Sequence, residues 1–212
     1  YAKKFGINDD LPELLSMSLG AGETTLLKLT NAYGMIVNGG KKTNYSFIDR
    51  VQDRRGKTIM KNDLRDCHSC NSVDIVDETK IPQIQDEREK VTDPGSAYQM
   101  VSMLRGAVLR GTGRLVNKIQ KTLAGKTGTT NSNMDAWFVG FSSDLVVGVY
   151  VGFDEPMSLG YKETGSSVSA PIFRNFMEKA LENKQDIPFR RPSGIKLIKV
   201  DLKTGLMVKS KD

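Results

Sequence analysis

The sequence has little of the residues on which several kinds of active site depend. It holds one histidine, two cysteines and one tryptophan in 212 residues. The single histidine, His68, lies in a polar segment, which argues against a Ser-His-Asp triad. Cys67 and Cys70 flank it, but one Cys-x-x-Cys pair is only half of a zinc site. We therefore expect no metal site and no cofactor, and leave open whether the two cysteines form a local disulfide or remain free thiols.

Long apolar runs and one-sided basic clusters are also missing. No apolar run approaches the roughly 20 residues that span a bilayer. The net charge is +6 and the isoelectric point near 9.2, but the basic residues are scattered and not interleaved with aromatics. This pattern argues against nucleic-acid binding and suits an acidic polymer such as cell wall. Because the chain opens on Tyr1 without a signal-like segment, we expect it to be part of a longer protein.

A hydrophobic content of 38% with 26% charged residues is typical of a soluble globular protein. Helical spacing of apolar residues predicts a core helix over 24–37. Asp93 and Pro94 predict the N-cap and first turn of a second helix that ends at Gly111-Thr-Gly113. A third helix, from about Ser169, should cover a sheet with one apolar stripe: Ile172, Phe173, Phe176, Met177, Ala180 and Leu181.

Three strands joined by tight turns are predicted over 121–130, 135–141 and 145–153. The second and third are apolar at nearly every position, so both of their faces should be covered, and Trp137 should lie in the core. Residues 41–94 differ in character, with a predicted hairpin over 47–60 followed by a polar stretch, which indicates a surface insertion. Residues 185–212 form a basic tail with a predicted hairpin.

The stretch from Leu123 to Thr130, Leu-Ala-Gly-Lys-Thr-Gly-Thr-Thr, carries the chemistry. A phosphate-binding loop would need glycine where Gln120 stands and would have to lead into a helix, whereas a turn and a strand follow. The alternative is the Lys-Thr-Gly element that penicillin-recognising serine enzymes place on a strand at the rim of the active site. The predicted strand favours this second interpretation.

The residue types define what such a strand can do. Lys126 would supply positive charge beside a nucleophile and favour a bound carboxylate. The hydroxyls of Thr127 and Thr129 can hydrogen-bond that carboxylate, and Gly128 leaves room for a substrate backbone to lie against the strand. The Thr129 N–H could form half of an oxyanion hole, where loss of one donor typically costs about 3 kcal/mol of barrier.

Four segments in this order and spacing resemble the transpeptidase domain of bifunctional class A penicillin-binding proteins. They are Leu-Ala-Gly-Lys-Thr-Gly-Thr-Thr, Asp-Ala-Trp-Phe-Val-Gly-Phe, Val-Gly-Val-Tyr-Val-Gly-Phe-Asp and Ala-Pro-Ile-Phe-Arg-Asn-Phe-Met. The resemblance covers nearly all of residues 1–184 and implies an α+β fold, the C-terminal portion of a serine beta-lactamase/D,D-transpeptidase-like domain. It implies that Lys126, Thr127, Gly128 and Thr129 form the family's third motif.

The resemblance also implies a reaction and its partners. A serine would attack the penultimate D-Ala of a peptidoglycan stem peptide, release the terminal D-Ala and pass the acyl group to an amine of a neighbouring strand. Beta-lactams would be mistaken for that substrate. The parent protein would lie at the periplasmic face of the inner membrane, anchored by an N-terminal transmembrane helix, with a glycosyltransferase elsewhere in its chain.

The family's first two motifs, Ser-x-x-Lys and Ser-x-Asn, are not found in convincing positions. Ser193 to Lys196 fits the first pattern but follows the third motif and leads into a strand, and Ser69 to Asn71 fits the second but lies in the polar insertion. We therefore expect a chain without the nucleophile, separated from the N-terminal half of its own domain. Its exposed helix surfaces should make it marginally stable or prone to associate. A non-catalytic peptidoglycan-binding module and a beta-lactamase-like hydrolase remain alternatives.

The first prediction is that the isolated chain forms no covalent penicillin adduct, because the acylatable serine is absent. Fluorescent penicillin, followed by denaturing electrophoresis, should leave the band unlabelled. A labelled band that disappears in Ser193→Ala would show instead that Ser193 is the nucleophile.

Overall fold

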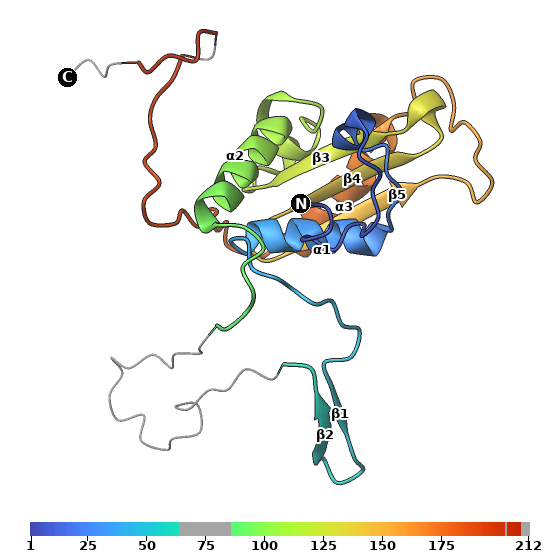
Figure 1. The fold of residues 1–212 in the computed structure, drawn as a ribbon, viewed down its shortest axis with the longest axis vertical. Coiled ribbons are helices and arrows are strands. Elements are labelled where there is room, and N and C mark those ends of the chain that lie inside the picture. Colours follow the sequence, from blue (N-terminus) through green and yellow to red (C-terminus); the bar gives the residue numbers. More distant parts are fainter. Residues whose placement is uncertain (64–85, 202, 209–212) are drawn as a thin grey trace.

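The structure, a computed structural model, describes residues 1–63, 86–201 and 203–208. Its centre is an antiparallel sheet in the order β3-β4-β5, formed by β3 (Ala124–Thr129), β4 (Ala136–Phe141) and β5 (Val146–Val151). Helices α1 (Leu26–Val37) and α2 (Pro94–Arg110) pack on one face, and α3 (Ala170–Ala180) packs on the other (Figure 1). The predicted α+β class, the three helices and the three strands are confirmed.

Side-chain caps fix where α1 and α2 begin. The Thr25 hydroxyl accepts a hydrogen bond from the Lys28 N–H at 3.2 Å. The Asp93 carboxylate accepts one from the Ser96 N–H at 2.9 Å. A hydrogen bond from the Ser96 hydroxyl, followed by the one from its N–H, lowers the pKa of Asp93. Pro94 follows as the first helical residue, where its missing N–H leaves no partner unpaired. Both predicted helix starts are thus explained by capping, although α1 begins two residues after position 24.

Two facing glycines make room for the aromatic core behind β3 and β4. The rings of Phe138 and Phe173 lie 4.6 Å apart and are fully buried. Gly125 on β3 pairs with Gly140 on β4. A Cβ at Gly140 would come within 2.8 Å of both rings, and one at Gly125 within 2.9 Å of Phe138. Since no side chain tolerates such contacts, the rings fix glycine at the position before Lys126.

Three predictions about burial are wrong in part. β4 is buried at almost every position because it is the central strand, but β5 is an outer strand of the described sheet and is only half-buried. Trp137 is likewise half-buried and packs edge-on against Tyr150, with ring centroids 4.9 Å apart. Ile172 and Phe176 are 48% and 52% exposed, since each lies about 100° around α3 from the buried neighbour that follows it in sequence.

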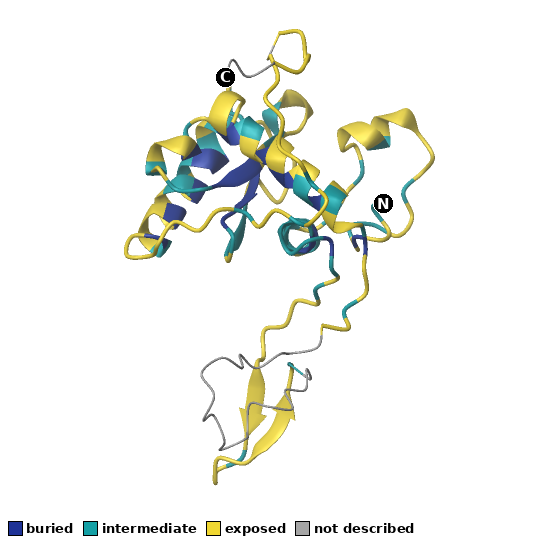
Figure 2. Cartoon of the chain, turned by 90° about the vertical axis from the view of Figure 1, so that its left-hand side faces the viewer, coloured by how far each residue is buried: buried dark blue, intermediate teal, exposed yellow. Residues whose placement is uncertain are grey.

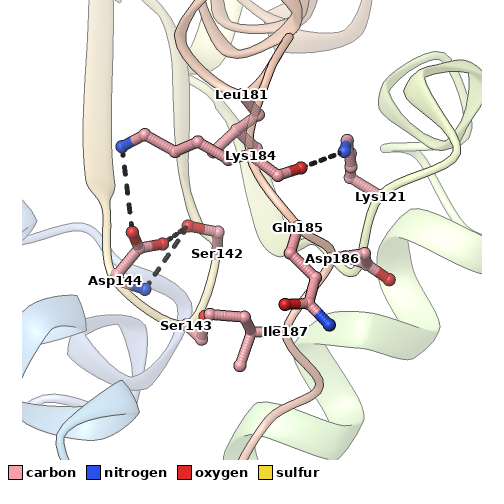
Figure 3. Close-up of a pocket in the computed structure, with 9 residues that line it drawn as sticks. All are labelled: Lys121, Ser142, Ser143, Asp144, Leu181, Lys184, Gln185, Asp186 and Ile187. Atoms are coloured by element: carbon pink, nitrogen blue, oxygen red, sulfur yellow. Dashed lines mark hydrogen bonds and ion pairs between the residues drawn. The ribbon is translucent and has the colours of Figure 1, made fainter.

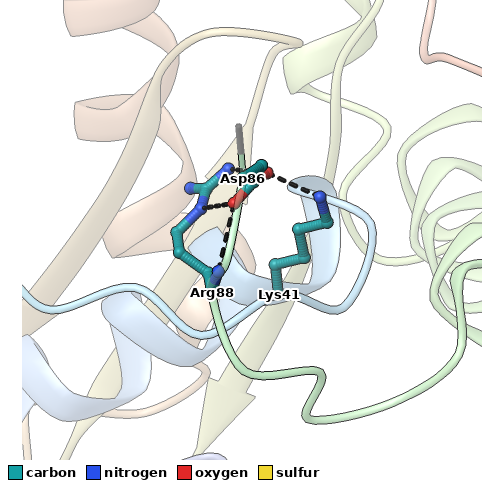
Figure 4. A network of polar contacts seen from close by, with 3 residues as sticks. All are labelled: Lys41, Asp86 and Arg88. Atoms are coloured by element: carbon teal, nitrogen blue, oxygen red, sulfur yellow. Dashed lines mark hydrogen bonds and ion pairs between the residues drawn. The ribbon is translucent and has the colours of Figure 1, made fainter. Parts of the chain in front are cut away.

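The insertion carries the predicted hairpin, with shorter strands than expected. β1 (Arg50–Gln52) and β2 (Thr58–Lys61) are exposed at every position and project from the body of the molecule (Figures 1 and 2). At its base, Lys41 and Arg88 both pair with Asp86 (Figure 4). Hydrogen bonds from Arg88 and then Lys41 hold the pKa of Asp86 far below its usual range. Cys67, His68, Cys70 and the segment 69–71 lie outside the described residues.

The start of β3 is tied to the chain that follows α3 (Figure 3). The Asp186 carboxylate accepts hydrogen bonds from the N–H and the hydroxyl of Thr122, both at 2.7 Å, and Lys121 Nζ donates to the Lys184 carbonyl at 2.6 Å. Beside this junction lies a hollow of about 220 Å³, lined also by Ser142. Further on, the predicted tail hairpin is reduced to a bridge between Val200 and Met207.

Within the described ranges, no helix is long and apolar enough to cross a membrane.

The second prediction concerns this junction. Asp186→Asn should melt a few degrees lower than the unchanged chain at pH 7, because the charged acceptor of two hydrogen bonds is lost. The Thr122 N–H, followed by its hydroxyl, lowers the pKa of Asp186. Because the pKa of Asp186 is lower in the folded chain than its unfolded value of about 3.9, the ionised carboxylate stabilises the fold at pH values above that unfolded pKa. This contribution disappears as the pH falls through the pKa of the folded chain.

Thermal unfolding followed by circular dichroism between pH 7 and pH 3 should therefore show the difference shrink below about pH 4. Glu182→Gln, in the exposed turn that follows α3, is the matched control. An Asp186→Asn deficit that stays constant at low pH would contradict the assignment.

Candidate active-site strand

The outer edge of β3 is open in the part of the chain that the structure describes, because β3 pairs only with β4 there. The Thr130 N–H donates to the Asp135 carbonyl at 3.1 Å, which marks this as a hydrogen-bonded pair. Hydrogen-bonded pairs alternate with non-hydrogen-bonded pairs along an antiparallel ladder. The backbone groups of Lys126 and Gly128 therefore point toward β4, and those of Thr127 and Thr129 point outward. The Thr129 N–H accordingly faces the open edge, as an oxyanion donor must.

The Lys126 ammonium lies over this same edge. Its side chain is exposed, and Nζ donates to the Thr127 carbonyl at 2.9 Å and approaches Thr127 Oγ1 at 3.3 Å. The Lys126 side chain leaves the sheet on the face of α1 and α2, because Lys126 lies two residues after Ala124, which packs with Val101 and Leu104 of α2. It must therefore curl across the edge to reach Thr127. The cation and the outward backbone groups consequently share one location.

The Thr129 hydroxyl is held from a distant part of the chain. The Gly165 N–H donates to Thr129 Oγ1 at 3.0 Å. Gly165 begins a π-helical turn, Gly165–Ser169, which runs directly into α3. At the other end of the turn, the buried Ser169 hydroxyl donates to the Ala136 carbonyl at 2.7 Å. The turn thus fastens the ends of β3 and β4 together.

The Thr127 hydroxyl has a partner of its own in the loop that follows α2. Thr112 Oγ1 and Thr127 Oγ1 lie 2.6 Å apart. Sequence reasoning missed both Thr112 and Gly165 as site residues. The signal for Thr112 was its place between two glycines, which indicated a tight turn toward the sheet. Gly165 closes a glycine-containing loop, and no local pattern distinguishes it.

The predicted residues Lys126, Thr127, Gly128 and Thr129 are together because they share one strand. Ser193 lies on an exposed turn of the tail, so the Ser-x-x-Lys match there is not on a helix. Ser69 lies outside the described residues. The groups gathered at the edge are an ammonium, two hydroxyls and a backbone N–H. A set dominated by donors with one positive charge is suited to an anionic, extended ligand.

An antiparallel sheet between helices, with Lys-Thr-Gly on an edge strand of the described part of the chain, is the arrangement of the penicillin-recognising serine enzymes. The chain belongs to the penicillin-binding protein transpeptidase family. The model of this family, described as "Penicillin binding protein transpeptidase domain", matches residues 6–178. It is 48% identical over 97% of its length to penicillin-binding protein 1A of Rickettsia prowazekii, and 39% identical over 92% to that of Neisseria gonorrhoeae.

The crystal structure of penicillin-binding protein 1A from Haemophilus influenzae is similar in fold. It superposes with a TM-score of 0.81 at 29% sequence identity, over 98% of this chain and 34% of that one. The chain spans only about a quarter of the length of the curated relatives that it matches: 26% of the Rickettsia protein and 23% of the Neisseria protein.

The third prediction tests the π-helical turn. A Cβ at Gly165 would lie 2.5 Å from the Gly128 carbonyl oxygen and would also strike the Trp137 carbonyl oxygen. Because both obstacles are backbone, Gly165→Ala should push the turn off the strands and cost about 1–3 kcal/mol of unfolding free energy. Urea denaturation would measure it.

Gly106→Ala is the matched control. It lies inside α2, and its Cβ would meet only the flexible end of Arg110. Alanine favours helix interiors, so this variant should be neutral or stabilised by up to about 1 kcal/mol. Equal midpoints for the Gly165→Ala chain and the unchanged chain would refute the close-packing argument.

Proposed function

We propose that the chain supplies the substrate-binding strand of a D,D-transpeptidase that cross-links peptidoglycan, with its nucleophilic serine outside residues 1–212. The observation that carries the proposal is the open edge of β3, where the Lys126 ammonium, the Thr127 hydroxyl and the Thr129 N–H converge. Membership of the penicillin-binding protein transpeptidase family supports it.

The edge would bind the end of a stem peptide as an added strand. An extended peptide pairs with outward N–H and C=O groups, which Thr127 and Thr129 provide in alternation with the paired Gly128. The terminal D-Ala carboxylate would then lie beside Lys126 and the two threonine hydroxyls. A carboxylate only accepts hydrogen bonds, whereas an ammonium only donates them, so the pairing is complementary.

In the first half-reaction the serine Oγ forms a bond to the carbonyl carbon of the penultimate D-Ala. The Thr129 N–H would stabilise the resulting oxyanion. The bond to the terminal D-Ala nitrogen then breaks, and the leaving amine takes the proton that the serine hydroxyl has lost. In the second half-reaction an amine of a neighbouring strand attacks the acyl ester, forms the cross-link and releases the serine. With a beta-lactam the same attack opens the ring amide, and the leaving nitrogen stays attached to the acyl group.

This reaction places the parent protein at the extracytoplasmic face of the bacterial membrane, where peptidoglycan is assembled. It also assigns the rest of the cleft, including the serine, to the larger part of the parent chain that these residues do not include.

The fourth prediction concerns Lys126 and Thr127 in the full-length protein. Lys126→Ala should lower the rate of acylation by a reporter beta-lactam at least about a hundredfold, because a positioned charge acts on the transition state. Thr127→Ala should lower it less, since Thr129 and solvent can partly replace one neutral hydrogen bond worth about 1 kcal/mol. Stopped-flow acylation, with folding checked by circular dichroism, measures both.

Lys118→Ala removes an exposed cation from the turn before β3 and should leave the rate unchanged. Small and equal losses in Lys126→Ala and Thr127→Ala would mean that Lys126 is only a solvated edge residue.

A further inference from the structure

The hydroxyl pair of Thr112 and Thr127 is shorter than any other contact of the candidate site, at 2.6 Å between the two Oγ1 atoms. Thr127 Oγ1 also lies 3.3 Å from the Lys126 ammonium. A threonine hydroxyl has one proton to donate and two lone pairs that accept, whereas an ammonium can only donate. Lys126 therefore occupies one lone pair of Thr127. The direction of the bond to Thr112 decides where the single proton of Thr127 points.

If Thr127 donated to Thr112, its only proton would be used in that bond. An anionic ligand at the open edge of β3 would then face a lone pair of Thr127. If Thr112 donates, both lone pairs of Thr127 are filled and its proton is free for the ligand. A carboxylate only accepts, so its binding selects the second arrangement. The result is a chain of hydrogen bonds from Thr112 through Thr127 to the carboxylate, in which each bond polarises the next.

The loop around Thr112 is built to hold this residue in place. The N–H groups of Gly111 and Gly113 both donate to the Ala107 carbonyl, at 3.0 and 3.1 Å. A Cβ on Gly111 would lie 2.9 Å from that oxygen, and one on Gly113 would lie 3.3 Å from it. Only glycine fits without displacement on either side. The backbone can therefore fold tightly against the end of α2 and present Thr112 to β3.

We propose that Thr112 is a positioning residue that donates a hydrogen bond to Thr127 and so directs the Thr127 proton toward the carboxylate of the substrate. This inference rests on the proposed function, and it adds a residue from outside the Lys-Thr-Gly motif to the recognition of the anionic substrate end. Thr112 acts through Thr127 and touches no reacting atom.

The test uses the full-length protein and two reporters, a chromogenic cephalosporin with its free carboxylate and the methyl ester of the same compound. Thr112→Val keeps the shape and removes the hydroxyl. It should lower the second-order acylation rate for the acid by about fivefold, the effect of one neutral hydrogen bond. The rate for the ester should change much less. Thr112→Ser should restore the rate for the acid, and thermal melting should confirm that each variant is folded.

A double-mutant cycle with Thr127→Val separates positioning from an independent effect. If Thr112 acts through Thr127, the double variant should be no slower with the acid than Thr127→Val alone. Additive losses, equal losses for acid and ester, or no loss in Thr112→Val would each overturn the inference. If the unchanged full-length protein is acylated by neither reporter, the proposed function itself fails, which is distinguishable from all of these outcomes.

Discussion

The pairing of β3 with β4 is the constraint on which the candidate site depends. In the observed register Gly125 faces Gly140, and the space above them is filled by the fully buried rings of Phe138 and Phe173. A slip of one residue would place side chains where the rings lie and would send Lys126 to the opposite face. Burial of large aromatics, worth several kcal/mol each, thereby fixes the position of an exposed cation. The chemistry at the edge is set by packing behind the strand.

The exposure of Lys126 limits what β3 can do by itself. Two unit charges 4 Å apart attract by about 1 kcal/mol in water and about 4 kcal/mol near a protein surface of lower effective dielectric. An ammonium in contact with solvent therefore contributes little specificity. A second protein surface packed over the edge of β3 would exclude water. It would strengthen the attraction between the Lys126 ammonium and a bound anion without changing any atom of β3. The chain spans about a quarter of the length of the curated relatives that it matches.

The sequence was sufficient for features with a local physical cause. Asp93 and Pro94 predicted the start of α2, and the helical spacing of apolar residues predicted α1. Apolar runs between turn residues predicted β4 and β5. Lys126 to Thr129 could be recognised because four adjacent residues carry the motif. The half-burial of β5 and the exposure of Phe176 could not be predicted, because they depend on which faces find a neighbour in space. The contacts of Thr127 with Thr112 and of Thr129 with Gly165 join residues 15 and 36 positions apart, so no periodicity reports them.

These two contacts also explain why the strand needs both flanking segments. Thr127 and Thr129 share one face of β3, and each hydroxyl meets a hydrogen-bond partner from a different element: the loop after α2 for Thr127, and the π-helical turn before α3 for Thr129. A backbone N–H can only donate, so at Thr129 the direction is fixed and the hydroxyl proton stays available. If Thr112 donates in the same sense, both hydroxyl protons are available to a ligand. The bond between Thr112 and Thr127 can run in either direction, and a bound carboxylate selects the direction in which Thr112 donates. Folding thus places the two partners, and the ligand aligns their protons.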